Sequence, residues 1–371
     1  MDAPPMTSSP ASAVRGAHLA GLAVQSLNRE CFCVSLDPAA LDSALASQIG
    51  EADIVNLMRE RCPYAFSARP VFVSHAQQER MMDAIRAVES VVALPAYREQ
   101  ILAAAPAIAR RDPGGAKGVF LGYDFHVTDE AIGLIEVNTN AGGAMLNAVL
   151  ARAQRRCCAP LRDLGRDART LEENIVAMFR NEWRLSGGAD PLRCIAIVDE
   201  SPEVQYLYSE FLLFQRLFER HGLKAVIADP RALTLRDGGL WHGDTRIDLI
   251  YNRLTDFMLE APSSAVVREA YLQRAAVLTP HPQAHALYAD KRNLAIWSDA
   301  RQLEALDVPA QTQGILLANI PRTEIVDAAQ ADRLWRGRRG LFFKPMSGFG
   351  SRAAYRGDKL TQRVWQSIVN G

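Results

Sequence analysis

The sequence has no long hydrophobic run and no excess of either charge. No stretch of about 18 uninterrupted apolar residues occurs in its 371 residues, so we expect no membrane-spanning helix. Lys plus Arg and Asp plus Glu each number 42, and this balance argues against a general nucleic-acid coat. Residues 1–15 are rich in Pro, Ser and Ala and lack the apolar segment of a signal peptide. We therefore expect a disordered start and a cytoplasmic protein that binds neither nucleic acid nor membrane.

The sequence also lacks the paired cysteine motifs of a structural zinc site. Its six cysteines are Cys31, Cys33, Cys62, Cys157, Cys158 and Cys194. Neither Cys-x-Cys nor Cys-Cys is a C-x-x-C knuckle, so zinc is not expected. In a reducing cytoplasm, buried free thiols are the default. An enzyme that uses Cys157 or Cys158 as its reactive group is one alternative interpretation.

What the sequence does contain is typical of a folded α/β protein. Apolar residues make up 49% and charged residues 23%, and the length favours two or three domains. Up to Arg110, apolar residues recur mostly at three- and four-residue spacing, which predicts a helical region over residues 16–115. Breakers at Asp112–Gly115 and Ser186–Pro191 mark the next two boundaries.

The pattern after the second boundary predicts a parallel sheet. Arg193–Val198 and Leu223–Ala228 are apolar strands on either side of a long amphipathic helix, Glu203–His221. Ile247–Tyr251 is a third apolar strand, and Arg253 follows it closely. Because ligands in open α/β sheets lie at the carboxyl ends of the strands, this end is a candidate binding edge.

A second group of polar residues lies on a predicted hairpin within Gly122–Gly143. Glu136 and Asn138 are two residues apart on one strand, so both side chains leave the same face, about 7 Å apart along it. Asp124 lies on the partner strand and reaches that face if the register allows. Two carboxylates and an amide oxygen are hard donors of the kind that Mg²⁺ requires. The alternative is an ordinary hairpin whose polar residues face water.

Two lysines and a glycine loop complete the candidate site. Lys344 lies on a strand that otherwise resembles core, so its ammonium needs a charged partner. The loop after it, which offers backbone N–H groups to a phosphate, consists of Ser347, Gly348, Phe349, Gly350 and Ser351. It is not a Walker A loop, because the lysine precedes the glycines. Asp290 begins a predicted helix that places Lys291 in its first turn, where a cation hints at an anionic partner, although exposed lysines are common there.

Together these motifs resemble the ATP-grasp superfamily. The resemblance is carried by Lys344-Pro before a glycine loop, Asp290-Lys291 at a helix start, and Glu136-x-Asn138 on a strand. Because the Glu-x-Asn strand precedes both lysines, the order is similar to the circularly permuted ATP-grasp group that includes glutathionylspermidine synthase-like ligases. The resemblance covers roughly residues 116–371. It implies an ATP-grasp part with the metal-binding strands in residues 116–185, a Rossmann-like domain in 186–288, and an ATP-grasp part with the phosphate-binding lysines in 289–371.

The resemblance also implies a function. Such enzymes are ATP-dependent ligases that join a small-molecule carboxylate to an amine or a thiol through an acyl phosphate. Asp124, Glu136 and Asn138 would hold Mg²⁺. Lys291, Lys344 and the 347–351 loop would bind the phosphates of ATP. Arg253 and Lys344 would serve catalysis, with Arg253 binding an anionic substrate or intermediate. Oligomeric state is not implied.

The sequence departs from the family pattern at its end. In the resembled fold, a strand that holds adenine follows the glycine loop, whereas this sequence ends at Gly371. We therefore expect a truncated ATP-grasp part and poor turnover by this chain alone. The alternative from another class is a non-catalytic nucleotide- or ligand-binding module with an incomplete ATP-grasp site.

Overall fold

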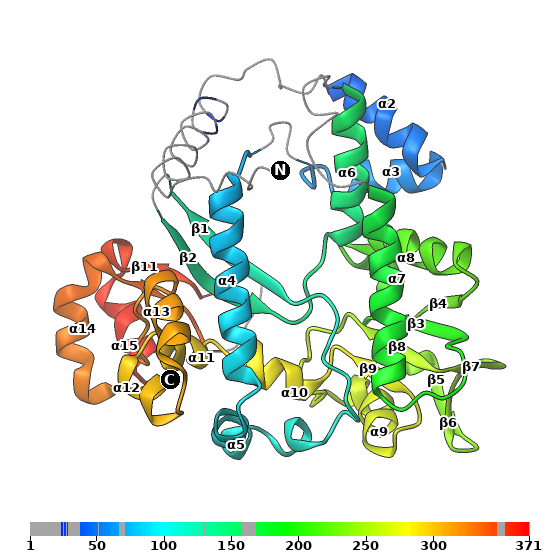
Figure 1. Cartoon of the computed structure of the whole chain (residues 1–371). Helices are drawn as coiled ribbons and strands as arrows, with labels where there is room; N and C mark the ends of the chain where they lie inside the picture. Colours follow the sequence, from blue (N-terminus) through cyan, green and yellow to red (C-terminus); the bar gives the residue numbers. More distant parts are fainter. Residues whose placement is uncertain are drawn as a thin grey trace, which may run out of the picture.

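The computed structural model describes residues 38–50, 52–66, 71–128, 131–157, 168–346 and 353–370, together with residues 24, 26 and 28. Within these ranges helices surround four β-sheets, which confirms the predicted α/β class (Figure 1). None of the described helices is long and apolar enough to cross a membrane.

The largest sheet is parallel, with the strand order β4-β3-β8-β9. Its strands are β3 (Cys194–Val198), β4 (Lys224–Ala228), β8 (Leu249–Asn252) and β9 (Val277–Thr279). Every residue of β3 is buried, because alternate side chains enter two different cores. Ile195 and Ile197 pack with α7 (Ala168–Leu185) and α8 (Tyr208–Arg220), whereas Ala196 packs with α9 (Ala265–Gln273).

Two boundaries predicted for this region are wrong. The apolar run Ile247–Tyr251 is not one strand, because the Asp248 carboxylate accepts the N–H groups of Arg193 and Cys194 and ends the preceding strand. Ile247 therefore closes β7 of a three-stranded antiparallel sheet, which consists of β5 (Leu233–Arg236), β6 (Gly239–His242) and β7 (Thr245–Ile247). The helix predicted from Glu203 begins only at Tyr208, because left-handed Ser201 leads into a short 3₁₀ turn, η4 (Pro202–Val204).

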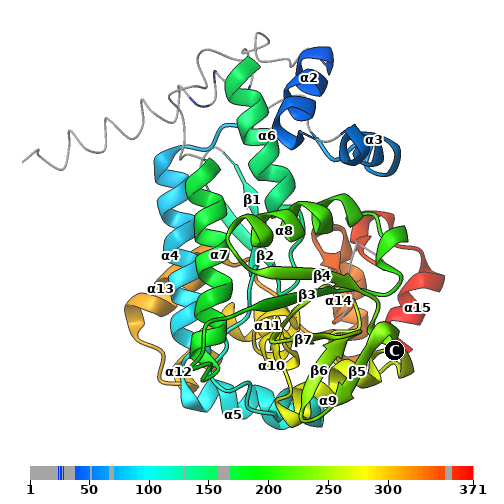
Figure 2. The same cartoon turned by 90° about the vertical axis from the view of Figure 1, so that its right-hand side faces the viewer.

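In its described residues, the region predicted to be helical consists mainly of helices. They are α2 (Pro38–Ile49), α3 (Ala52–Arg61), α4 (His75–Val92) and α5 (Pro95–Ala104), with the 3₁₀ turn η2 (Ala107–Arg110) after Pro106. A capping box between Ser74 and Gln77 begins α4. Helix α2 packs along α6 (Ala144–Cys157) at one end of the molecule, and the β5–β7 sheet lies toward the other end (Figure 2).

The predicted hairpin consists of β1 (Gly122–Val127) and β2 (Ile132–Asn138), paired antiparallel. One of its faces is covered by α4 and by α13 (Ala310–Asn319), in a core that includes Val88, Leu134, Val137, Trp297 and Leu316. This hairpin lies apart from the parallel sheet, and α4 crosses in front of it (Figure 1).

The C-terminal residues form a smaller unit with its own core of Leu334, Phe343, Leu360 and Trp365. The elements between β9 and the end of the described chain are α10 (Pro282–Ala284), the π-helix η7 (His285–Ala289), α11 (Arg292–Trp297), α12 (Ala300–Ala305), α13, η8 (Ala328–Gln330), α14 (Ala331–Gly337), η9 (Arg338–Gly340), β10 (Phe342–Phe343), β11 (Tyr355–Arg356), η10 (Gly357–Lys359) and α15 (Gln362–Asn370). Strand β11 pairs antiparallel with β10. Two short 3₁₀ turns, η5 (Pro230–Ala232) and η6 (Pro262–Ser264), precede β5 and α9, respectively.

Candidate functional site

The orientation of the acidic residues is set by a β-bulge in the hairpin. Asp124 pairs with Glu136 and Phe125 pairs with Leu134, so Ile135 is the extra residue on β2. Before the bulge, Ile132 and Leu134 are buried; after it, Val137 is buried. The bulge therefore reverses the alternation, and Glu136 leaves the core face on which its even number would otherwise place it.

Asp124, Glu136 and Asn138 do come together on one face. The register places Asp124 directly opposite Glu136, and the Asn138 Nδ2 donates to Asp124 Oδ2 over 3.2 Å. Partial burial and the adjacent Glu136 carboxylate raise the pKa of Asp124, while Lys344, the Asn138 amide and Lys291 oppose this rise. Two anionic groups held this close disfavour each other's charge, so the pair suits a cation.

Both predicted lysines reach Glu136, from segments far apart in the sequence. Lys291 Nζ lies 3.2 Å from Glu136 Oε1, and Lys344 Nζ lies 3.1 Å from Glu136 Oε2. Lys344 also donates to the Ile135 carbonyl over 3.4 Å. The three charged side chains are only 14% (Lys291), 26% (Lys344) and 19% (Glu136) exposed. The prediction that Lys344 needs a charged partner is thus confirmed, and its partner is Glu136.

The position of Lys291 differs from the prediction. No helix begins at Asp290; instead the π-helix η7 ends at Ala289 and α11 begins at Arg292, with Lys291 just before it. Asp290 binds the guanidinium and the N–H of Arg292 and so fixes the turn between η7 and α11, which we call the corner. The Lys291 N–H donates to the Met346 carbonyl over 3.2 Å, which joins the corner to the segment that carries Lys344.

The predicted phosphate loop, residues 347–351, lies outside the described residues. The described chain on its two sides is Met346 and Ala353.

Arg253 lies next to the site but does not contact Asp124, Glu136 or the lysines. Its side chain is buried, and Nη1 donates to the Asn140 side chain over 2.8 Å and to the carbonyls of Asn140 and Ala141 over 3.3 Å. It thereby holds the loop that follows Asn138. A Cβ atom at Gly142 would lie 2.8 Å from Arg253 Nη2 and closer still to Leu207 Cδ1, so a larger residue there would have to displace one of these side chains. Binding of a substrate anion by Arg253 stays a prediction.

Two acidic residues near this loop were not predicted. Glu210 is fully buried on α8 and accepts the N–H groups of Gly143 and Met145 at the start of α6. Asp199 follows β3 at the carboxyl edge of the parallel sheet, where burial raises its pKa to about 7. Sequence alone offered one signal, since Asp199 follows a fully apolar strand; nothing local distinguishes Glu210 from an exposed helix residue.

The hairpin residues fit a magnesium ion bound together with phosphate. Within the described ranges no cluster of three or more His, Cys, Asp or Glu side chains could hold a metal. The candidate set is instead two carboxylates and the Asn138 amide oxygen, whose nitrogen already donates to Asp124. Mg²⁺ in nucleotide sites is commonly held by one or two carboxylates plus phosphates and water, and this donor set suffices for that.

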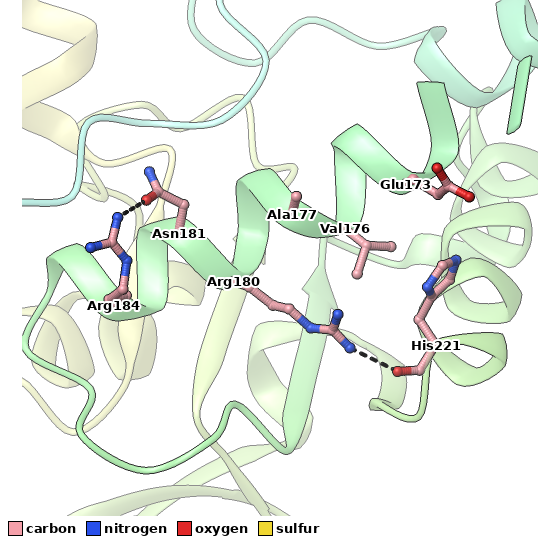
Figure 3. Close-up of a pocket in the computed structure, with 7 residues that line it drawn as sticks. All are labelled: Glu173, Val176, Ala177, Arg180, Asn181, Arg184 and His221. Carbon is pink, nitrogen blue, oxygen red and sulfur yellow. Dashed lines mark hydrogen bonds between the residues drawn. The ribbon is translucent and has the colours of Figure 1, made fainter. Parts of the chain in front are cut away.

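A separate hollow of about 430 Å³ lies along α7, between its outer face and His221 (Figure 3). Arg180 donates to the His221 carbonyl across it, and Arg184 donates to Asn181. None of the predicted site residues lines it. We assign it no function.

Comparison of the sequence with models of protein families gives no match, and comparison with curated proteins gives none. The functional argument therefore rests on the geometry described above.

Proposed function

We propose that the protein is a Mg-ATP-dependent carboxylate–amine or carboxylate–thiol ligase of ATP-grasp type that works through an acyl phosphate. The observation that carries the proposal is the convergence of Lys291 and Lys344 on Glu136, beside Asp124 and Asn138. These residues lie on three segments that are far apart in the sequence, and the fold brings them together. Cationic and acidic groups side by side are what a metal–polyphosphate complex requires.

Each residue has a distinct role in this proposal. Asp124, Glu136 and the amide oxygen of Asn138 would hold Mg²⁺, and Lys291 and Lys344 would hold and orient the phosphates. Bound Mg-ATP would supply the phosphoryl group that activates the carboxylate. Arg253 keeps the Asn140–Ala141 loop in place and so positions Asn138. The chain's contribution to rate would be positioning and charge neutralisation.

A non-catalytic module is the second candidate, and one observation favours it. The two lysines are already ion-paired with Glu136, and such a bridge also serves simply to fasten the C-terminal unit to the hairpin. In that case nucleotide would not bind, or would bind without turnover.

The test is calorimetric titration with Mg-ATP, followed by a search for amine-dependent phosphate release. Asp124→Asn keeps the shape of the side chain and removes one anionic ligand, so affinity for Mg-ATP should fall at least about tenfold, which is about 1.4 kcal/mol. Asp244→Asn is the matched control, because Asp244 is fully exposed on the turn before β7 and should bind like the parent. Equal affinities for the parent and Asp124→Asn would refute the metal assignment.

A further inference from the structure

In the structure Glu136 is bound in the manner of a phosphate. Each of its carboxylate oxygens forms an ion pair with a different ammonium group: Oε1 with Lys291 and Oε2 with Lys344. We call these three residues the lysine–glutamate bridge. A phosphate oxygen pair would make the same two contacts, so the bridge and a polyphosphate compete for the same lysines.

Resting on the function proposed above, we propose that the lysine–glutamate bridge is an internal lock, which metal and polyphosphate open only together. Glu136 would turn from the lysines to the metal, and the lysines that it releases would bind the phosphates. Neither ligand alone offers an opposite charge to both the carboxylate and the ammonium groups of the bridge.

The charges around the bridge explain why a single ligand is excluded. Asp124 and Glu136 carry two negative charges, and Lys291 and Lys344 carry two positive charges, so the group is neutral as it stands. A metal ion alone would meet two ammonium groups, and a polyphosphate alone would meet two carboxylates. At this degree of burial such like-charge contacts are costly, because the screening by water is reduced. When both ligands bind, each new charge meets its opposite, and the coupling is reciprocal.

The two carboxylates contribute differently to the lock. Glu136 contacts both lysines, whereas the side-chain contact of Asp124 is the Asn138 amide. Both residues are expected to hold the metal, but only Glu136 blocks the lysines. This asymmetry gives a pair of variants that separate the two effects.

The experiment measures the binding of inorganic tripolyphosphate in EDTA, without nucleotide or metal. Glu136→Gln is isosteric and removes the internal anion, so we expect it to bind metal-free tripolyphosphate at least about tenfold more tightly than the parent chain. Asp124→Asn should show at most a much smaller gain. Adding Lys344→Met to Glu136→Gln should abolish the gain, because the freed ammonium is its source. Equal affinity of Glu136→Gln and the parent chain for metal-free tripolyphosphate would overturn the lock.

A second measurement does not depend on the variants folding. Tripolyphosphate is titrated into the parent chain at increasing Mg²⁺ concentrations, and its affinity should rise by more than tenfold through the range in which the metal binds. A chain whose affinity is the same with and without Mg²⁺ has no lock.

The outcomes also separate the lock from the proposed function. If the parent chain binds no Mg-ATP while Glu136→Gln gains affinity for tripolyphosphate, the lock stands and the ligase proposal fails. If Mg-ATP binds and Glu136→Gln shows no gain, the lock alone fails.

Discussion

At the scale of single residues, Asp199 differs from the other carboxylates at the carboxyl edge of the parallel sheet. Asp229 is paired with Arg231, and Glu200 accepts a hydrogen bond from Ser263. Among the described residues, Asp199 accepts a hydrogen bond only from the Glu200 N–H. Burial, slightly offset by that bond and by Arg253, raises its pKa to about 7.

A carboxyl with a raised pKa makes stability depend on pH in a defined direction. The folded state binds the proton more tightly than the unfolded state, so the stabilising contribution of this carboxyl is fully present below its ordinary pKa of 3.8 and is lost as the pH rises toward 7. Asp199→Asn should therefore increase the free energy of unfolding at pH 8 by roughly 2 to 4 kcal/mol, and by much less near pH 4. Urea unfolding at both pH values tests this, with Asp244→Asn as the exposed control. A variant as stable as the parent at pH 8 would contradict it.

His281 has the opposite dependence. It is buried, its Nδ1 accepts the Ala284 N–H, and its Nε2 donates to the Ala116 carbonyl, so both ring nitrogens are used in the neutral form. Burial lowers its pKa to about 4. The stability gained by keeping it neutral is present above pH 6.5 and lost as the pH falls toward 4.

His281→Gln should accordingly flatten the acid side of the stability curve, removing roughly 3 kcal/mol of its fall between pH 6.5 and 4. His75→Gln is the matched control, because His75 lies exposed at the start of α4. Thermal unfolding as a function of pH is the measurement. Parallel curves for both variants and the parent chain would show that His281 does not titrate in this range.

The residues of the candidate site were predictable to different degrees. Glu136 and Asn138 could be paired from their two-residue spacing, because that spacing holds on any strand. The position of Asp124 opposite Glu136 could not be predicted, because it depends on the unpaired Ile135. The convergence of Lys291 and Lys344 on Glu136 is a set of tertiary contacts, which no local pattern encodes.

At the scale of elements, Glu210 joins α8 to the start of α6. Its carboxylate accepts the N–H groups of the half-buried Gly143 and the buried Met145. Glu210→Ala should therefore lower the free energy of unfolding by about 3 kcal/mol. Glu219→Ala, at an exposed position on the same helix, should change it by less than about 0.5 kcal/mol. Chemical denaturation of the two variants provides the comparison. Equal losses of unfolding free energy would argue against a stabilising role of Glu210 at the start of α6.

Elements with a strong local pattern were predicted well, and those ended by tertiary contacts were not. The helix α4 has a long apolar face, and β3 is a continuous apolar run. The split at Asp248 was missed because its cause is a hydrogen bond to Arg193, more than fifty residues earlier. The late start of α8 follows from the left-handed Ser201, a conformation that the sequence gives no reason to expect.

At the scale of the whole molecule, the C-terminal unit has a core of its own. Trp365 is buried against Phe343 and Trp335, at ring-centroid distances of 5.4 and 5.9 Å. Phe343 directly precedes Lys344, so this small core also supports the lysine–glutamate bridge. The domain boundaries predicted from sequence stay predictions.

Trp365→Ala should loosen this unit without unfolding the parallel sheet. Such a truncation of a buried tryptophan costs about 3–5 kcal/mol locally. Hydrogen exchange should become faster in residues 326–346 and 353–370 and remain slow in β3, and Mg-ATP affinity should fall. Trp241→Ala, at a half-buried position in the β5–β7 sheet, is the control and should leave the C-terminal residues unchanged. Equal acceleration in β3 would show that the molecule unfolds as one unit.

Because β2 has one extra residue, the site also depends on the number of residues in each strand of the hairpin. Before Ile135 the even-numbered side chains of β2 face the core, and after Ile135 the odd-numbered side chain of Val137 does so. A chain that has gained one residue between Asp124 and Phe125 would retain every carboxylate, amide and ammonium group of the site. The added residue would pair with Ile135, the hairpin would pair without interruption, and either Leu134 or Glu136 would then be on the wrong face. Among relatives of this chain, a one-residue insertion between Asp124 and Phe125 should therefore distinguish proteins that keep the motif and do not bind nucleotide from those that bind it.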